Sequence, residues 1–353
     1  INNNTTSLSP MKGYLYRNES TDTLITFRGT LNQGQHDFNL VINASETNYQ
    51  GWNLVANPYC APVDWKGNGW DKSNIANSFY FYHHTIEQPC AFVGGISNPR
   101  GCSNGVIPPM KAFWVYAHQQ GTFSVNDSAL TEVLEYQSAD QSYNTKSIRL
   151  TLSDEDSWYE TLIILDNSAT NEFEINQDAY HMPVPLNDYP WSPGFYTMDK
   201  LNNCLSVNAL SDLEELSIPI GISLLHEGNH TLRAEEIQYV TQTVYLTDKD
   251  LEKQVSLTES DYSFNESNLQ RQDRFVLTTE LLTGINWDAG ETKSPIKDVY
   301  GYQGKIYIIP EKNIRVRARV CDLLGRLVYD EVLDLNGLRT IPMDKTGIFV
   351  VIL

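Results

Sequence analysis

The fifteen residues from Gly51 to Trp65, GWNLVANPYCAPVDW, constrain the fold more than any other part of the sequence. Trp52 and Leu54 alternate with Asn53 and Val55, and a period of two residues is typical of a β-strand with one apolar face. A strand that carries a tryptophan in such a pattern predicts the centre of a β-sandwich.

The corner after this strand adds to the same prediction. Asn57-Pro58 ends the strand, because proline has no backbone N–H and pushes the residue before it out of the helical region. Tyr59, Val63 and Trp65 follow as bulky side chains that a tight turn must pack against a core. We therefore expect Trp65 to be buried.

Length and composition indicate several β domains. The chain has 353 residues, with twenty tyrosines against five methionines, and no apolar run approaches the ~18 residues of a membrane span. We predict an all-β fold of two consecutive jelly-roll-like β-sandwich domains, residues 1–140 and 141–290, followed by a small Ig-like β-sandwich, residues 296–353. The helical candidate is Ala209–Leu216, and Gly284–Pro295 reads as a linker.

The corner also carries a resemblance. It resembles the GWNLxGNPYPSxIDW stretch of large secreted and surface proteins of Bacteroidetes-type bacteria, which often end in a type 9 secretion sorting domain. Ile107–Val115, IPPMKAFWV, matches the same pattern, and Gly304–Ile308 and Gly347–Val351 follow the order of a sorting domain. Leu324-Gly325 is expected to form a hairpin turn there. The resemblance implies an extracellular or outer-membrane surface location and no shared enzymatic activity.

Charge limits the possible partners. The formal net charge is −19 and the pI is about 4.7, so phosphate backbones and anionic membrane surfaces would be repelled. We expect no nucleic-acid partner and no membrane insertion, and a glycan or a surface protein as the possible partner. The start, Ile1–Asn4, is polar and no signal-peptide pattern follows, so we expect a mature piece of a longer precursor.

Five cysteines are an odd number, so at least one thiol is free. Cys90 and Cys102 bracket a Gly/Pro-rich loop, and we predict that they form a disulfide in an oxidising compartment or lie close enough to do so. Cys204 and Cys321 are expected to be buried free thiols, and Cys60 lies in the corner. No Cys/His spacing suggests a metal, and we predict no metal and no cofactor.

Motifs for catalysis are not found in the sequence. There is no Gly-x-Ser-x-Gly, His-Glu-x-x-His or Walker loop, so we predict no catalytic residues and no enzymatic activity. Asp154-Glu155-Asp156 could hold calcium, but a solvated turn is the favoured interpretation. His83-His84 are adjacent, and adjacent residues of a strand point to opposite faces.

Aromatic residues in loops are the candidates for ligand binding: Trp70, Tyr189 and Trp191. Exposed rings of this kind stack on sugars or contact a partner chain, although Trp191 could instead plug the end of the second sandwich. Trp70 follows a glycine-rich loop and is predicted to be largely exposed, whereas Trp52 and Trp114 are predicted to be buried in the first sandwich.

These observations predict a non-catalytic, exported cell-surface β-scaffold that serves adhesion or another interaction. A carbohydrate-binding module of a surface glycan-handling system is the alternative, and a hydrolase ranks third. A planar aromatic platform would favour the carbohydrate module, and convergent acids in one pocket would favour the enzyme.

Overall fold

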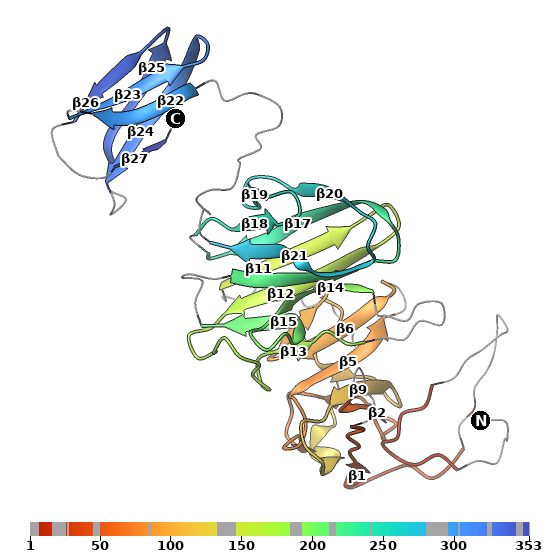
Figure 1. The fold of residues 1–353 in the computed structure, drawn as a ribbon. Helices are drawn as coiled ribbons and strands as arrows, with labels where there is room; N and C mark the ends of the chain where they lie inside the picture. The colour runs from red at the N-terminus through yellow and green to blue at the C-terminus, as the bar shows by residue number, and fades with distance from the viewer. Residues whose placement is uncertain are drawn as a thin grey trace. The chain divides into compact units, whose positions relative to one another are not determined.

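The structure is a computed structural model of the chain. It describes residues 7–15, 26, 28–44, 50–83, 86–132, 146–183, 193–211, 217–240, 242–279, 296–302, 304–322, 327–343 and 349–352. The chain divides into two compact units, Ile1–Asn286 and Trp287–Leu353. Apart from one 3-10 turn, Asp127–Ala129, every regular element in these ranges is a β-strand, which confirms the predicted all-β class (Figure 1). No helix in the described ranges is long and apolar enough to cross a membrane.

A five-stranded antiparallel sheet organises the first part of the first unit. In spatial order its strands are β2 (Trp52–Ala56), β9 (Ala112–Tyr116), β5 (Ser78–His83), β6 (Gln88–Val93) and β7 (Ile96–Asn98). Two small sheets accompany it: β1 (His36–Asn39), β10 (Thr122–Val125) and β4 (Trp70–Asp71), and β3 (Val63–Asp64) with β8 (Val106–Ile107).

The first core fills the space that these three sheets share. Val55 of β2, Phe113 of β9 and Phe123 of β10 belong to it, together with Trp65. Trp65 is 2% exposed, and its ring centroid lies 5.2 Å from that of Phe79. The prediction that the corner buries Trp65 is confirmed.

The predicted orientation of strand β2 is wrong. Trp52 and Trp114 are only partly buried, and they face away from the first core. The residues of β2 that turn toward the first core are Val55 and Asn53, and the Asn53 side chain accepts from Val41 N and donates to Val41 O, both at 2.9 Å. These two bonds satisfy a polar side chain at a position that the pattern had assigned to solvent.

An eleven-stranded sheet forms the rest of the first unit. Its order is β19 (Lys253–Ser256), β18 (Tyr245–Asp248), β21 (Gln270–Thr278), β16 (Ser217–Ser223), β14 (Gly194–Met198), β15 (Cys204–Leu210), β12 (Trp158–Leu165), β11 (Lys146–Ser153), β17 (Gly228–Gln238) and β20 (Tyr262–Glu266), with β13 (Ala179–Tyr180) paired to β15. Strands β12 and β15 run parallel, and the other neighbouring pairs run antiparallel.

This sheet curls until its two ends face each other. The second core draws on strands from both ends, and the rings of Phe264 on β20 and Phe275 on β21 lie 4.7 Å apart. Strand β20 stands at one end of the spatial order, whereas β18 and β21 stand at the other. The sheet is therefore nearly closed around its apolar residues.

A third core joins the two large sheets. Tyr80 and Ala91 of the five-stranded sheet pack with Leu162, Ile164 and Val207 of the eleven-stranded sheet. In Figure 1, β6 accordingly lies beside β13 and β15. The five-stranded sheet is thus covered on both faces, which is why alternation along β2 does not reveal which face meets the first core.

The second unit is a small sandwich of two three-stranded sheets. The strands are β22 (Ile296–Tyr302), β23 (Lys305–Pro310) and β26 (Arg339–Pro342) in one sheet, and β25 (Leu327–Leu335), β24 (Ile314–Asp322) and β27 (Phe349–Ile352) in the other. Ile308 of β23 and Val320 of β24 are fully buried in the core between the two sheets.

Several sequence predictions concern residues that the structure does not describe. The linker Gly284–Pro295 and the Leu324-Gly325 turn lie outside the described residues. The helical prediction for Ala209–Leu216 is wrong where it can be compared, because Ala209 and Leu210 end strand β15. Tertiary pairing with β12 decides the conformation of this short apolar segment, as it often does against weak helix propensity.

Candidate functional site

Trp70 does not form an exposed platform. Its ring is partly buried, packs against the first core and stacks on Phe123 with the centroids 5.4 Å apart and the planes 11° from parallel. Its indole N–H donates to the Asp64 backbone oxygen at 2.8 Å. The prediction of a largely exposed Trp70 is therefore wrong. Less of its ring surface is available to contact a ligand than the sequence predicted. Tyr189 and Trp191 lie outside the described residues.

Cys90 and Cys102 are joined by a disulfide whose Cα atoms lie 5.9 Å apart. Both residues are buried in the first core, where the bridge ties β6 to the loop after β7. Of the other cysteines, Cys60 is exposed, while Cys204 and Cys321 are partly buried. Burial raises the pKa of the Cys204 thiol, so this thiol is a poor nucleophile at neutral pH.

Asp154 organises the turn between β11 and β12 rather than a calcium loop. Its Oδ1 accepts from the backbone N–H groups of Asp156 and Ser157 at 2.9 and 2.6 Å. Its Oδ2 faces Nδ1 of His226 at 3.7 Å and Nδ1 of His230 at 3.8 Å. Burial lowers the pKa of His230, which is 2% exposed, although Asp154 acts in the opposite direction. Within the described residues, no group of three or more metal-ligating side chains has the arrangement of a metal site.

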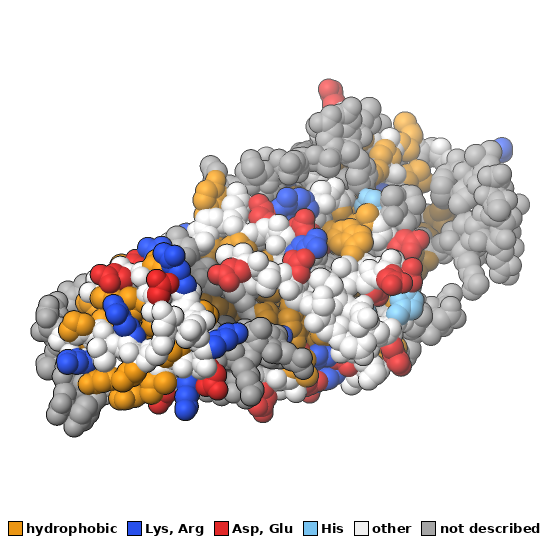
Figure 2. All heavy atoms as spheres, turned by 90° about the horizontal axis from the view of Figure 1, so that it is seen from above, with side chains coloured by type: hydrophobic (Ala, Val, Ile, Leu, Met, Phe, Trp, Pro, Cys, Tyr) orange, Lys and Arg blue, Asp and Glu red, His pale blue; other side chains and the backbone are white. Residues whose placement is uncertain are grey.

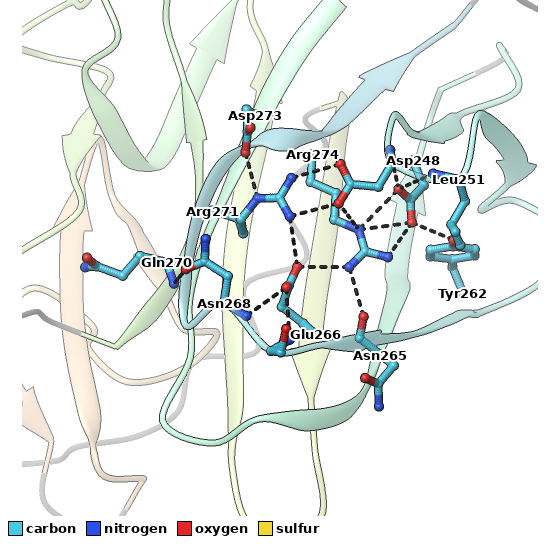
Figure 3. Close-up of polar contacts among 12 residues, drawn as sticks. Asp248, Leu251, Tyr262, Asn265, Glu266, Asn268, Gln270, Arg271, Asp273 and Arg274 are labelled. Carbon is cyan, nitrogen blue, oxygen red and sulfur yellow. Dashed lines mark hydrogen bonds and ion pairs between the residues drawn. The ribbon is translucent and has the colours of Figure 1, made fainter.

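A cluster of charged side chains lies where the curled sheet meets itself (Figure 3). Arg274 donates to both carboxylate oxygens of Asp248, with the shortest bond 2.7 Å, and to Glu266 at 2.9 Å. Arg271 bonds Asp250 through two nitrogens, at 2.8 and 2.9 Å, and Asp273 at 2.7 Å. We call this set the closing network.

The closing network has a structural task. Glu266 and Tyr262 come from β20, at one end of the sheet, and Arg274 and Asp248 come from β21 and β18, at the other. Tyr262 donates to Asp248 at 2.8 Å. The side chains thus link two ends whose described strands form no backbone ladder with each other. The acids converge, but each is held by an arginine, so the network does not offer a free general acid or base.

A second cluster contains aromatic rings at the junction of the two large sheets. Trp52 of β2 contacts Tyr80 of β5 at 4.8 Å and Tyr116 of β9 at 5.5 Å, as ring-centroid distances. Tyr116 contacts Tyr180 of β13 at 4.5 Å, and Tyr180 stacks on Phe173 at 4.1 Å with the planes 16° from parallel. We call these five residues the junction cluster. Tyr80 is fully buried, and the other four residues are partly exposed.

A buried carboxylate holds the loop that carries Phe173. Asp178 is 1% exposed, and its two oxygens accept from Ala209 N on β15 and from Glu174 N, both at 2.6 Å. The same loop is also bonded to the segment before β5 of the five-stranded sheet, because the Asn77 backbone N–H donates to the Ile175 carbonyl oxygen at 2.7 Å. Burial raises the pKa of Asp178 to about 7, against the effect of its two backbone hydrogen bonds.

The junction cluster also presents polar atoms. Among the described residues, the hydroxyls of Tyr116 and Tyr180 have no hydrogen-bond partner, and neither oxygen is fully buried. Partial burial raises the pKa of both phenols, and for Tyr180 the neighbouring Tyr116, Asp199 and Asp178 add to the effect. Both groups therefore remain protonated and can donate a hydrogen bond at neutral pH.

Comparison with protein families places the chain in a family. A family model described as "Domain of unknown function (DUF8693)" matches residues 1–278. The chain belongs to this family. The match covers most of the first unit and ends before the described strands of the second unit. Searches of curated proteins and of solved structures found no match.

Sequence reasoning missed the junction cluster for a definite reason. Its members come from four separate segments of the chain, and Trp52 was assigned to the other face of β2. One signal was available, since the alternate positions of the Ala112–Tyr116 strand put Trp114 and Tyr116 on one face and Phe113 and Val115 on the other. Large apolar residues on both faces of a strand indicate a sheet that is covered on both sides.

Proposed function

We propose that the chain is an exported, non-catalytic cell-surface scaffold that acts in adhesion or another interaction. The observation that carries this proposal is the double-sided burial of the five-stranded sheet, which packs it against the eleven-stranded sheet within one compact unit and holds the partly exposed junction cluster between the two sheets. Binding residues on a rigid β framework lose little conformational freedom when they engage a partner.

The disulfide supports export. A bridge in the first core persists in an oxidising environment, such as a periplasm or a cell surface, and is rare in the cytosol. The resemblance of the Gly51–Trp65 corner to surface proteins of Bacteroidetes-type bacteria supports the same location.

The roles of the acidic groups support a non-catalytic function. Asp248 and Glu266 are neutralised by Arg274, and both oxygens of Asp178 accept backbone N–H groups. These carboxylates are committed to holding strands and loops. On the face shown in Figure 2, acidic and basic side chains are interspersed, without a field of one sign that would attract a polyanion.

The location is tested by labelling intact cells that produce the protein with a membrane-impermeant biotin reagent. We expect the chain to be labelled on intact cells to the same extent as after lysis. Recovery of unlabelled chain in the cytoplasm alone would refute export. Turnover of a glycosidase, esterase or peptidase substrate that disappears with one Asp, Glu, His or Ser substitution would refute the non-catalytic part.

A further inference from the structure

The junction cluster combines two features that point to a ligand with both apolar and polar surface. Four of its rings are partly exposed and contiguous, from Trp52 through Tyr116 and Tyr180 to Phe173. At the same place, two tyrosine hydroxyls that are not fully buried have no partner among the described residues. A surface made only for an apolar peptide would leave these hydroxyls desolvated and unpaired when it is covered, and that costs binding free energy.

The cluster is also fixed before any ligand arrives. Trp52 and Tyr116 are cross-strand partners in the register of β2 and β9. Phe173 is held by the turn that Asp178 and Asn77 bond to the two sheets. Rings held by strands and by buried hydrogen bonds need little ordering on binding, which favours recognition of a small rigid unit.

The surrounding charge selects among such ligands. Asp199 lies close enough to Tyr180 to affect its phenol, and residues 1–286, which include the cluster, contain 15 basic against 35 acidic residues. An anionic sugar, a phosphate or a sulfate would be repelled there. A neutral sugar has C–H faces that pack on aromatic rings and hydroxyls that pair with phenols.

We propose that the junction cluster is a binding site for the neutral sugar units of a glycan, with the rings contacting the sugar face and the hydroxyls of Tyr116 and Tyr180 bonding its hydroxyls. The inference rests on the proposed function, because it names the ligand class of that scaffold's contact surface. It assigns a role to Tyr116, Phe173 and Tyr180.

The test is affinity electrophoresis of the purified full chain in gels that contain a neutral polysaccharide, with mannan, dextran, xylan and a β-glucan as the probes and alginate as the anionic comparison. At least one neutral probe should retard the chain, and alginate should not. Tyr180→Phe and Tyr116→Phe keep the rings and remove one hydroxyl each. Each should weaken binding about 3- to 10-fold, the size of one neutral hydrogen bond.

Phe173→Ala removes one ring and should weaken binding about 3- to 10-fold. Tyr300→Phe is the matched control, because Tyr300 also stacks on a tyrosine, Tyr307 at 5.0 Å, in the second unit. It should leave retardation unchanged. Thermal unfolding of each variant shows whether it is folded. If Phe173→Ala does not fold, the two conservative Tyr→Phe variants still test the site.

Three results would overturn the inference: no retardation by any neutral probe, retardation that Tyr180→Phe and Tyr116→Phe both leave unchanged, or stronger binding to alginate than to every neutral probe. Each of these would leave surface labelling of intact cells unaffected, so the proposed scaffold function could stand. Conversely, cytoplasmic recovery of a chain that still binds a neutral polysaccharide would refute export alone.

Discussion

Removal of Arg274 should open the curled sheet at the closing network. The side chain of Arg274 is 6% exposed, and its partners Asp248 and Glu266 are 1% and 5% exposed. Arg274→Met keeps much of the apolar volume beside Phe264 and Phe275 but leaves two carboxylates without their main cation. Removing one partner of a buried ion pair costs about 3–5 kcal/mol, because the remaining charge is desolvated and unpaired.

Urea unfolding monitored by tryptophan fluorescence measures this loss of unfolding free energy. In thermal unfolding, the same loss should lower the melting temperature of a unit of this size by about 6–20 °C. The control is Arg233→Met. Arg233 also contacts one aspartate, Asp261, through two nitrogens, but with side chains 53% and 46% exposed. Solvent screens that pair, so its removal should have far less effect.

The cause can be separated from general damage by a second substitution. If the unpaired charge of Asp248 dominates the loss, adding Asp248→Asn to Arg274→Met should restore part of the stability. An Arg274→Met protein that is as stable as Arg233→Met would refute the view that this network holds the two ends of the sheet together.

Three further changes test other parts of the structure. Cys90→Ala with Cys102→Ala should lower the free energy of unfolding by about 3 kcal/mol, the loop-closure value for a bridge spanning 12 residues, and a reductant should then have no additional effect on urea unfolding. His230 has a lowered pKa in the folded state, so the unfolded state binds its proton first as pH falls; its contribution is present above about pH 6.5 and is lost on acidification. The urea midpoint of His230→Gln should therefore change less between pH 7.5 and 5.5 than that of the wild type, and equal changes would contradict this. Trp65→Ala should cost about 3–5 kcal/mol, and Trp70→Ala less, since the Trp70 ring is only partly buried; the reverse order in urea unfolding would argue against the assigned burial.

Local chemistry was enough to predict the β class and the pair of bridged cysteines. Short alternating runs broken by Gly, Asn and Pro cannot form long helices, and apart from one 3-10 turn the described elements are strands. The twelve-residue separation of Cys90 and Cys102 around a turn-rich loop made a bridge geometrically accessible. The aromatic corner likewise indicated a buried Trp65, because a rigid turn leaves bulky side chains few directions other than the core.

What the sequence could not reveal is which surfaces meet. Alternation along Trp52–Ala56 separates two faces but does not say that both are covered, and here Asn53 turns to the first core while Trp52 joins the junction cluster. The ends of the eleven-stranded sheet meet through Arg274, Asp248 and Glu266, and these residues show no distinguishing motif in the chain. Strand spacing is a local property set by the backbone, so the sequence by itself determined the kind of structure. The packing of one sheet on another depends on contacts between segments far apart in the chain, and only the tertiary structure decided where the buried charges and the partly exposed rings come together.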